Sequence, residues 1–105
     1  MNRGEVWWAN MSAPMGKRPV LLLSRDRAIQ VRNSVTVAYI TRTIRGIPTE
    51  VRLDEEDGMP RRCVVNADVL LTIPKTQLSG RICALTATKL SSVGKAVLFA
   101  LAIGE

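Results

Sequence analysis

The residues with the clearest chemical potential are cationic and hydroxyl side chains at the ends of apolar segments. Arg18 follows Lys17 and directly precedes Pro19, which opens the aliphatic run 20–23. A guanidinium carries a permanent charge and five N–H donors, so it can hold an anion through two parallel hydrogen bonds. The alternative for Arg18 is a solvated cation at the start of a strand, with no ligand.

A second group of such side chains follows the apolar segment 34–40. It interleaves two hydroxyls with two arginines, namely Thr41, Arg42, Thr43 and Arg45. The chain has no histidine, so any acid–base chemistry must use less usual proton carriers. Cys63 and Cys83 lack metal-ligand spacing, and no histidine is present to complete a zinc site. We therefore expect reduced thiols, no metal centre and no cofactor.

Composition limits the kind of protein that carries these groups. The 105 residues are enough for one domain, 1–105, and a hydrophobic content of 47% is typical of a folded core. Lys and Arg outnumber Asp and Glu by 15 to 9, and the resulting net charge of +6 favours an anionic partner such as nucleic acid. The N-terminus has no secretory pattern, and the apolar stretch 96–103 is too short to cross a bilayer, so we expect a cytoplasmic protein.

The elements that must position these side chains are mostly short strands. The run 20–23 predicts a strand buried on both faces, and Pro19 is tolerated at its first residue while keeping Arg18 extended. Segment 34–41 is the clearest strand because it is rich in β-branched residues. Further strands are predicted at 5–11, 49–53, 63–68 with 69–73 (two strands or one bent strand) and 79–85.

The remaining segments predict connections and one helix. Segment 25–33 is polar and indicates a loop or a single helical turn, and Asp57-Gly58 marks a turn. Thr86 is a candidate N-cap for an amphipathic helix whose apolar stripe is Leu90, Val93, Val97, Leu98 and Leu101. The polar side chains of 49–53 should face water. The predicted fold is therefore mainly β (α+β), a small barrel of short antiparallel strands with a C-terminal amphipathic helix packed on it.

Four motifs in this order resemble the MazF/PemK family over nearly the whole chain. They are Arg3-Gly4-Glu5-Val6-Trp7, Arg18-Pro19-Val20-Leu21, Ile40-Thr41 and Thr72-Ile73-Pro74-Lys75. The resemblance implies an SH3-like or CcdB-like barrel, usually a homodimer. It also implies a ribosome-independent endoribonuclease, the toxin half of a toxin–antitoxin pair, whose partners are single-stranded mRNA and an acidic antitoxin.

The resemblance further implies which residues act on RNA. Arg18 and Thr41 match the catalytic arginine and threonine of the family. Cleavage without a metal uses the neighbouring 2′-OH as nucleophile and leaves 2′,3′-cyclic phosphate (or 3′-phosphate) and 5′-OH ends. Arg18 suits charge stabilisation better than proton donation, because an arginine pKa above about 12 makes it a poor acid. Thr41 can donate a hydrogen bond to the phosphate, or it can simply be a β-branched residue that ends a strand.

Other residues are candidates for RNA binding around this pair. Asp68 occupies the position of an RNA-contacting aspartate in part of the family. Because a carboxylate repels phosphates, Asp68 would accept a hydrogen bond from a base edge or from Arg18. The alternative is that Asp68 is a turn residue with no contact to RNA. Four further residues are candidates for binding the flanking phosphates, although any one such residue is more often simply solvated: Lys17, Arg42, Thr43 and Arg45. Trp7 and Trp8 could face opposite sides of the first strand. Either ring could stack on a base, fill a dimer interface or pack in the core.

The sequence departs from the family pattern at two points, and it leaves two other function classes open. The loop 11–17 is shorter than the family often has, and a histidine found there in some members is missing. A gyrase-poisoning toxin of the same fold would need neither Arg18 nor Thr41. A non-catalytic RNA-binding barrel would use stacking aromatics, of which Tyr39 and Phe99 supply few.

Overall fold

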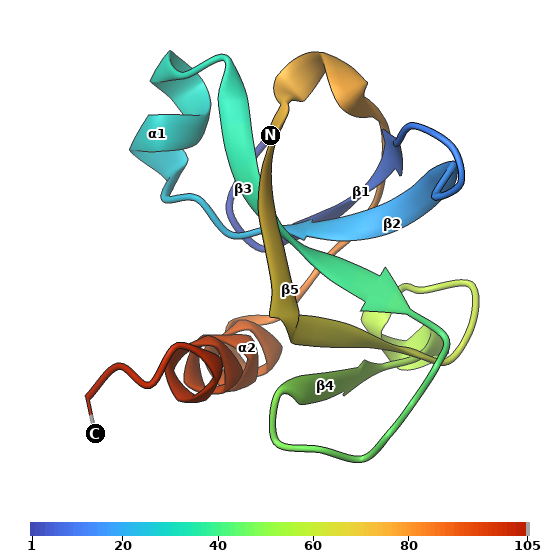
Figure 1. The fold of residues 1–105 in the computed structure, drawn as a ribbon, viewed down its shortest axis with the longest axis vertical. Helices are drawn as coiled ribbons and strands as arrows, with labels where there is room; N and C mark the ends of the chain where they lie inside the picture. Colours follow the sequence, from blue (N-terminus) through green and yellow to red (C-terminus); the bar gives the residue numbers. More distant parts are fainter. Residues whose placement is uncertain (105) are drawn as a thin grey trace.

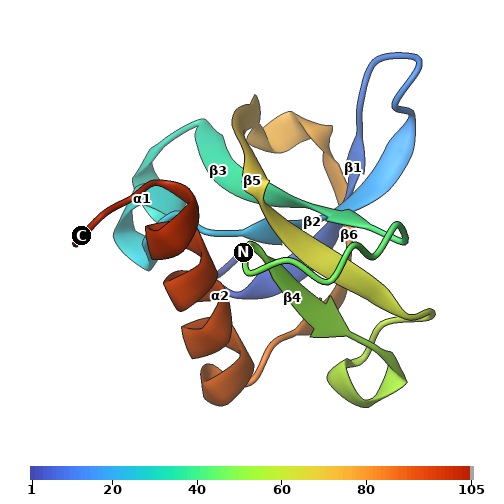
Figure 2. The ribbon, with the colours of Figure 1, turned by 60° about the horizontal axis from the view of Figure 1, so that its bottom comes forward.

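A single antiparallel sheet of six strands forms the body of the protein, in the order β4-β5-β3-β2-β1-β6 (Figure 1). The computed structural model describes residues 1–104. Figure 2 shows the sheet curling into a half-barrel with a helix along one side, as predicted for a mainly β fold. The elements are β1 (Glu5–Asn10), β2 (Lys17–Leu22), α1 (Asp26–Val31), β3 (Ser34–Thr41), β4 (Glu50–Leu53), η1 (Glu55–Asp57), β5 (Cys63–Pro74), η2 (Lys75–Gln77), β6 (Leu78–Ala84) and α2 (Ala87–Ala100).

The pairing of β2 with β3 ends before either strand does. Its last paired residues are Val20 and Tyr39. Beyond them, β2 continues back to Lys17 against β1 alone, while β3 continues to Thr41 against β5 alone, and Figure 1 shows the two strand ends diverging. Pro19 suits this position because it has no N–H to donate to a further rung. We call the separated ends, residues 17–19 and 40–41, the β2–β3 fork.

The segment 63–74 is one bent strand, the second of the two predicted alternatives. Against β3 its register shifts between Asn66, which lies opposite Tyr39, and Leu70, which lies opposite Ala38. The extra residues form a bulge, and a bulge bends its strand. The first half of β5 therefore pairs with both β3 and β4, while its second half pairs with β3.

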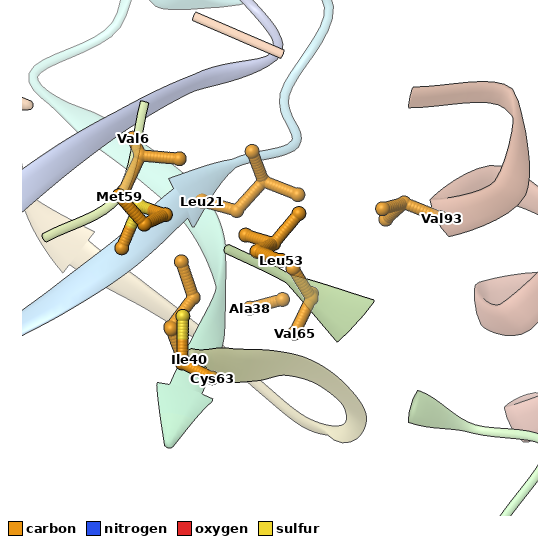
Figure 3. Packing of buried hydrophobic residues seen from close by; sticks show 9 residues of the cluster. All are labelled: Val6, Leu21, Ala38, Ile40, Leu53, Met59, Cys63, Val65 and Val93. Carbon is orange, nitrogen blue, oxygen red and sulfur yellow. The ribbon is translucent and has the colours of Figure 1, made fainter. Parts of the chain in front are cut away.

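Two apolar clusters pack on the two faces of the sheet. The predicted buried run is confirmed for Val20, Leu21 and Leu22, which have no exposed surface and alternate between the clusters. Leu23 lies beyond the end of β2 and is only partly buried. The second cluster contains Ala9, Val20, Leu22, Ile29, Val35, Val37 and Ile73. The first cluster, drawn in Figure 3, contains Val6, Leu21, Ala38, Ile40, Leu53, Met59, Cys63, Val65 and Val93 of α2.

The terminal helix begins as predicted, but only part of its predicted apolar stripe is buried. The Thr86 hydroxyl accepts a hydrogen bond from the Lys89 amide at 3.2 Å, which is N-cap geometry. Val93 is buried, whereas Leu98 and Leu101 are 47% and 53% exposed. Val97 still packs against the first cluster, so the uncovered part of the apolar stripe is its end, Leu98 and Leu101. None of the helices described is long and apolar enough to cross a membrane.

Two local predictions are refined or corrected. The segment 25–33 contains a six-residue helix, α1, because Ile29 is buried and the Lys75 ammonium donates to the carbonyls of Ile29 and Arg32. The expectation that polar residues of 49–53 face water is wrong for Thr49. Its side chain is buried because the hydroxyl donates to the Asp68 carboxylate at 2.7 Å. The Asp57-Gly58 turn is confirmed, with Gly58 at φ 98°.

Candidate active site

A cavity of about 420 Å³ opens at the β2–β3 fork, a volume within the range of small-molecule sites. The predicted residues Lys17, Arg18, Thr41 and Arg42 all line it. Continuing the β2–β3 register two residues past its last rung brings Arg18 opposite Thr41. The divergence of the strands therefore creates the space, and the register decides which side chains share it.

Arg18 enters this cavity without a counter-charge. Its Nε atom is buried and has no hydrogen-bond partner among the described residues. The guanidinium carbon lies 5.0 Å from the centre of the Tyr39 ring, and neither ion pair found in residues 1–104 involves Arg18. Buried polar groups without partners are uncommon in native proteins and call for an explanation. An anion bound in the cavity would supply the missing acceptor.

Thr41 has a hydroxyl whose orientation is partly set by the backbone. Its Oγ1 accepts a hydrogen bond from the Thr43 amide at 3.2 Å. Because a hydroxyl both donates and accepts, the Thr41 proton stays available for a second group in the cavity. A guanidinium and a hydroxyl donor thus face the same space.

The two tryptophans of β1 lie on opposite faces of the sheet. Trp8 lines the cavity, and the Lys17 ammonium lies 5.2 Å from the centre of a Trp8 ring. Trp7 packs against the second cluster and donates to the Glu5 carboxylate at 2.9 Å. Trp8 is therefore the tryptophan with access to a ligand.

Three predicted RNA-binding residues lie outside the cavity lining, namely Thr43, Arg45 and Asp68. Thr43 is connected to the site because its backbone N–H donates a hydrogen bond to the Thr41 hydroxyl. Arg45 belongs to the β3–β4 connection, where its backbone N–H donates to the Glu50 carboxylate at 3.0 Å and leaves its side chain exposed. Asp68 lies on the β5 bulge and accepts from Thr49.

The far wall of the cavity was missed from the sequence. It is made by the η1–β5 connection and the start of β5, from Met59, Pro60, Arg61 and Cys63. In this region the sequence indicates only a turn at Asp57-Gly58, and no local pattern predicts that the segment folds back to the fork. Ile40, Met59 and Cys63, labelled in Figure 3, belong both to the first cluster and to this lining.

Cys63 is a structural thiol and not a nucleophile. Burial raises its pKa to about 11, with smaller contributions from Cys83, Asp57 and Asp54. A thiol with that pKa stays protonated at neutral pH, and the thiolate is the reactive form. Both cysteines are free, and the described residues contain no cluster of three or more potential metal ligands among His, Cys, Asp and Glu. The charged and hydroxyl side chains of the cavity lining are Lys17, Arg18, Thr41, Arg42 and Arg61.

Comparison with known proteins identifies the family. A model described as "PemK-like, MazF-like toxin of type II toxin-antitoxin system" matches residues 2–101. The chain belongs to this family. The resemblance predicted from the four sequence motifs is confirmed.

Named relatives and solved structures agree with this membership. The chain is 42% identical over 91 residues to a probable endoribonuclease MazF2 of Mycobacterium tuberculosis, covering 86% of this chain and 87% of the relative. It is 46% identical over 81 residues to the probable endoribonuclease MazF5 of the same species, covering 76% and 73%.

Two solved structures share the fold closely. The Mycobacterium tuberculosis toxin MazF-mt6 matches at a TM-score of 0.88 and 33% identity, over 96% of this chain and 99% of that one. An endoribonuclease in complex with its cognate antitoxin from Mycobacterial species matches at 0.88 and 26% identity, over 100% and 98%. The half-barrel with a C-terminal helix is thus the fold of MazF toxins.

Proposed function

We propose that this MazF/PemK family member is an endoribonuclease toxin that cleaves single-stranded RNA at the β2–β3 fork, without a metal and without the ribosome. The observation that carries the proposal is the buried Nε of Arg18, which has no acceptor among the described residues, in a cavity that Thr41 also lines. The naming of its relatives as endoribonucleases supports the reaction class.

The reaction needs only groups that the cavity and the substrate supply. The 2′-OH of one nucleotide attacks the adjacent phosphorus, the P–O5′ bond breaks, and the products are a 2′,3′-cyclic phosphate and a 5′-OH. Arg18 donates hydrogen bonds to the phosphate oxygens as negative charge builds up on them, and Thr41 donates a further one. The 2′-OH proton passes to water, and a proton from water reaches O5′. Arg18 thus stabilises charge and does not give up its own proton.

The surrounding residues bind the flanking chain. Lys17 and Arg42 lie on the cavity and contact the neighbouring phosphates, and Trp8 stacks on a base. Asp68, Thr43 and Arg45 lie further out and contact more distant nucleotides, with Asp68 accepting from a base edge. Each of these contacts adds only a small amount of binding free energy, because it holds the RNA without touching the reacting phosphate.

The same cationic surface fits the partners of a type II toxin. One structural neighbour is an endoribonuclease bound to its cognate antitoxin. A chain with a net charge of +6 attracts an acidic antitoxin segment. The carboxylates of that segment would bind Arg18 and so exclude RNA. A second copy of the chain would cover the exposed apolar residues of the C-terminal segment, which are Leu98, Phe99, Leu101 and Ile103. The toxin acts in the cytoplasm, on mRNA.

The test compares purified wild-type and Arg18→Ala proteins on a long unstructured RNA in EDTA. We expect wild type to give discrete fragments with 5′-OH ends and Arg18→Ala to be slower by at least about 100-fold, the effect of a lost charge-stabilising donor. Arg27→Ala is the matched control, since Arg27 is an exposed arginine of α1. Intact RNA with wild type would indicate a binding protein. Undiminished cleavage by Arg18→Ala, or 5′-phosphate ends, would overturn the mechanism.

A further inference from the structure

We infer that Tyr39 is a positioning residue for the cleavage reaction, and that its ring face holds the Arg18 guanidinium in the orientation that receives the scissile phosphate. This inference rests on the proposed function, because it assigns Tyr39 a task only if Arg18 acts on RNA.

The geometry of the fork brings the two side chains together. Tyr39 lies opposite Val20 in the last rung of the β2–β3 ladder. Arg18 precedes Val20 by two residues, so both point to the same face of β2, and Arg18 is the diagonal cross-strand neighbour of Tyr39. The 5.0 Å separation between the guanidinium carbon and the ring centre is within cation–π range. Tyr39 also precedes Thr41 by two residues, on the same face of β3.

An aromatic ring supports this arginine in a way that a carboxylate would not. The ring attracts the cation through its quadrupole and carries no net charge that competes with the phosphate. A guanidinium that faces a ring keeps its N–H donors in its own plane, free for bidentate contact with an anion. Because Arg18 has no salt-bridge partner within residues 1–104, Tyr39 is its principal electrostatic contact.

Tyr39 is itself held from two directions. Its ring packs against the second apolar cluster, and its hydroxyl lies 2.7 Å from the Met15 sulfur in the β1–β2 connection. The ring is therefore fixed before any ligand arrives. A fixed ring reduces the freedom that Arg18 would lose on binding the transition state, which is the advantage of preorganisation.

The chain offers an unusually clean test because Tyr39 is its only tyrosine. Production with 3-fluorotyrosine in place of tyrosine changes the ring at one position and keeps its shape. Fluorine withdraws electron density from the ring face and so weakens the cation–π contact. The assay measures kcat and KM for a short RNA substrate at one fixed pH for all variants.

Three substitutions complete the series. Tyr39→Phe keeps the ring, Tyr39→Leu removes it, and Val37→Ala is the control because Val37 is a fully buried β3 residue of the same cluster that does not line the cavity. We expect Tyr39→Leu to lower kcat on the order of ten-fold with KM changed less than about two-fold, whereas Tyr39→Phe stays within about three-fold of wild type. The fluorotyrosine protein should fall between wild type and Tyr39→Leu.

A double-mutant cycle then links the effect to Arg18. In an Arg18→Lys background the compact ammonium no longer faces the ring as a plane, so Tyr39→Leu should reduce kcat by a smaller factor than in wild type. If wild type does not cleave, or if Arg18→Ala cleaves normally, the proposed function itself fails.

Other outcomes overturn the positioning role alone. If Arg18 is essential but Tyr39→Leu has wild-type kcat, or if Tyr39→Phe or Val37→Ala is as slow as Tyr39→Leu, then the ring does not orient Arg18. The same conclusion follows if the effects of Tyr39 and Arg18 variants are simply additive. Should Tyr39→Leu fail to fold, the fluorotyrosine protein decides the question, and an unchanged kcat there rejects the inference.

Discussion

Two arginines of the sheet have opposite surroundings. At the β1–β6 seam, Arg81 lies 3.3 Å from the Glu5 carboxylate with its own side chain 55% exposed. That carboxylate also accepts from the Trp7 indole at 2.9 Å and the Asn2 amide at 3.1 Å. At the β2–β3 fork, Arg18 has a buried Nε with no acceptor among the described residues.

Under the proposed function, the polar groups of the seam hold the fold, whereas those of the fork are left free to bind RNA. A buried donor without a partner costs about 1–3 kcal/mol, so the fork is a less stable arrangement than the chain could adopt. At the seam, by contrast, Arg81 has an acceptor within the chain, the Glu5 carboxylate. Substitutions at the fork should therefore change activity, and substitutions at the seam should change stability.

After Arg18→Ala, the largest effect is expected at the fork, from Thr41→Val. The substitution removes the hydroxyl and keeps the β-branched shape, so the loss of one transition-state donor should lower kcat by about 100-fold. Thr72→Val is the matched control, since Thr72 is an exposed strand threonine whose hydroxyl bonds to Thr36. RNA cleavage rates and thermal unfolding are measured together. A Thr41→Val protein that cuts normally would remove Thr41 from the mechanism.

At the seam, Glu5→Gln should lower the free energy of unfolding by about 1–2 kcal/mol at neutral pH, since hydrogen bonds to a charged group are lost. Desolvation would raise the Glu5 pKa, but hydrogen bonds from Trp7, Asn2 and Arg81 together lower it below 4.5. A lowered carboxyl pKa stabilises the fold above the unfolded value, and that stability is lost as pH falls through the folded value.

Urea denaturation at several pH values checks the seam prediction. The gap between wild type and Glu5→Gln should be largest at neutral pH and should shrink as pH falls below the ordinary glutamate value of 4.5. Cleavage by the folded variant should be unchanged. A gap independent of pH would mean that the carboxylate charge is not what joins β1 to β6.

A smaller effect is expected from Thr49→Val, which tests a third polar pair. Loss of the hydrogen bond to Asp68 should cost about 1 kcal/mol of stability, with cleavage rates within about three-fold of wild type. If Asp68 accepts a hydrogen bond from an RNA base, loss of the Thr49 hydrogen bond should instead change the RNA sequences at which the protein cuts. Fragment sequencing distinguishes the two results, and a large fall in rate at every site would place Asp68 in the catalytic machinery.

The smallest effect is expected from Arg45→Ala. The interaction with Glu50 uses the Arg45 backbone and survives the change. Loss of one phosphate contact should reduce the slope of log affinity against log salt by about 0.7, with only a modest loss of binding. RNA titrations at several salt concentrations measure that slope. An unchanged slope would show that the Arg45 side chain is solvated and touches no phosphate.

The strands were predictable because their signals are local. Segment 34–41 is β3 as predicted, and Thr86 caps α2, since β-branched composition and a capping hydroxyl act over a few residues. The bend in β5 is predicted from the sequence only as one of two alternatives, with a break between 63–68 and 69–73 as the other. Whether that break separates two strands or forms a bulge depends on the register with β3, which no local pattern contains.

The site was predictable only in part, for the same reason. Motifs single out Arg18 and Thr41, and both line one cavity because they follow the last rung of the β2–β3 register, Val20 opposite Tyr39. The wall formed by Met59 and Arg61 requires a loop to fold back across the sheet, and the Tyr39 contact requires knowledge of which cross-strand neighbours share a face. Burial of Thr49 likewise depends on a partner 19 residues away. Long-range pairing decides these features.

The strand order has a consequence for how the toxin is made. β1 lies between β2 and β6, so the first strand synthesised keeps an open edge until the last one, ending at Ala84, has been made. Translation at about 5–20 residues per second puts seconds between the synthesis of Arg18 and that of Ala84. Open edges are templates for aggregation. We expect a nascent or truncated chain to meet chaperones and proteases as an incomplete sheet, so that its toxicity begins only when translation is nearly complete.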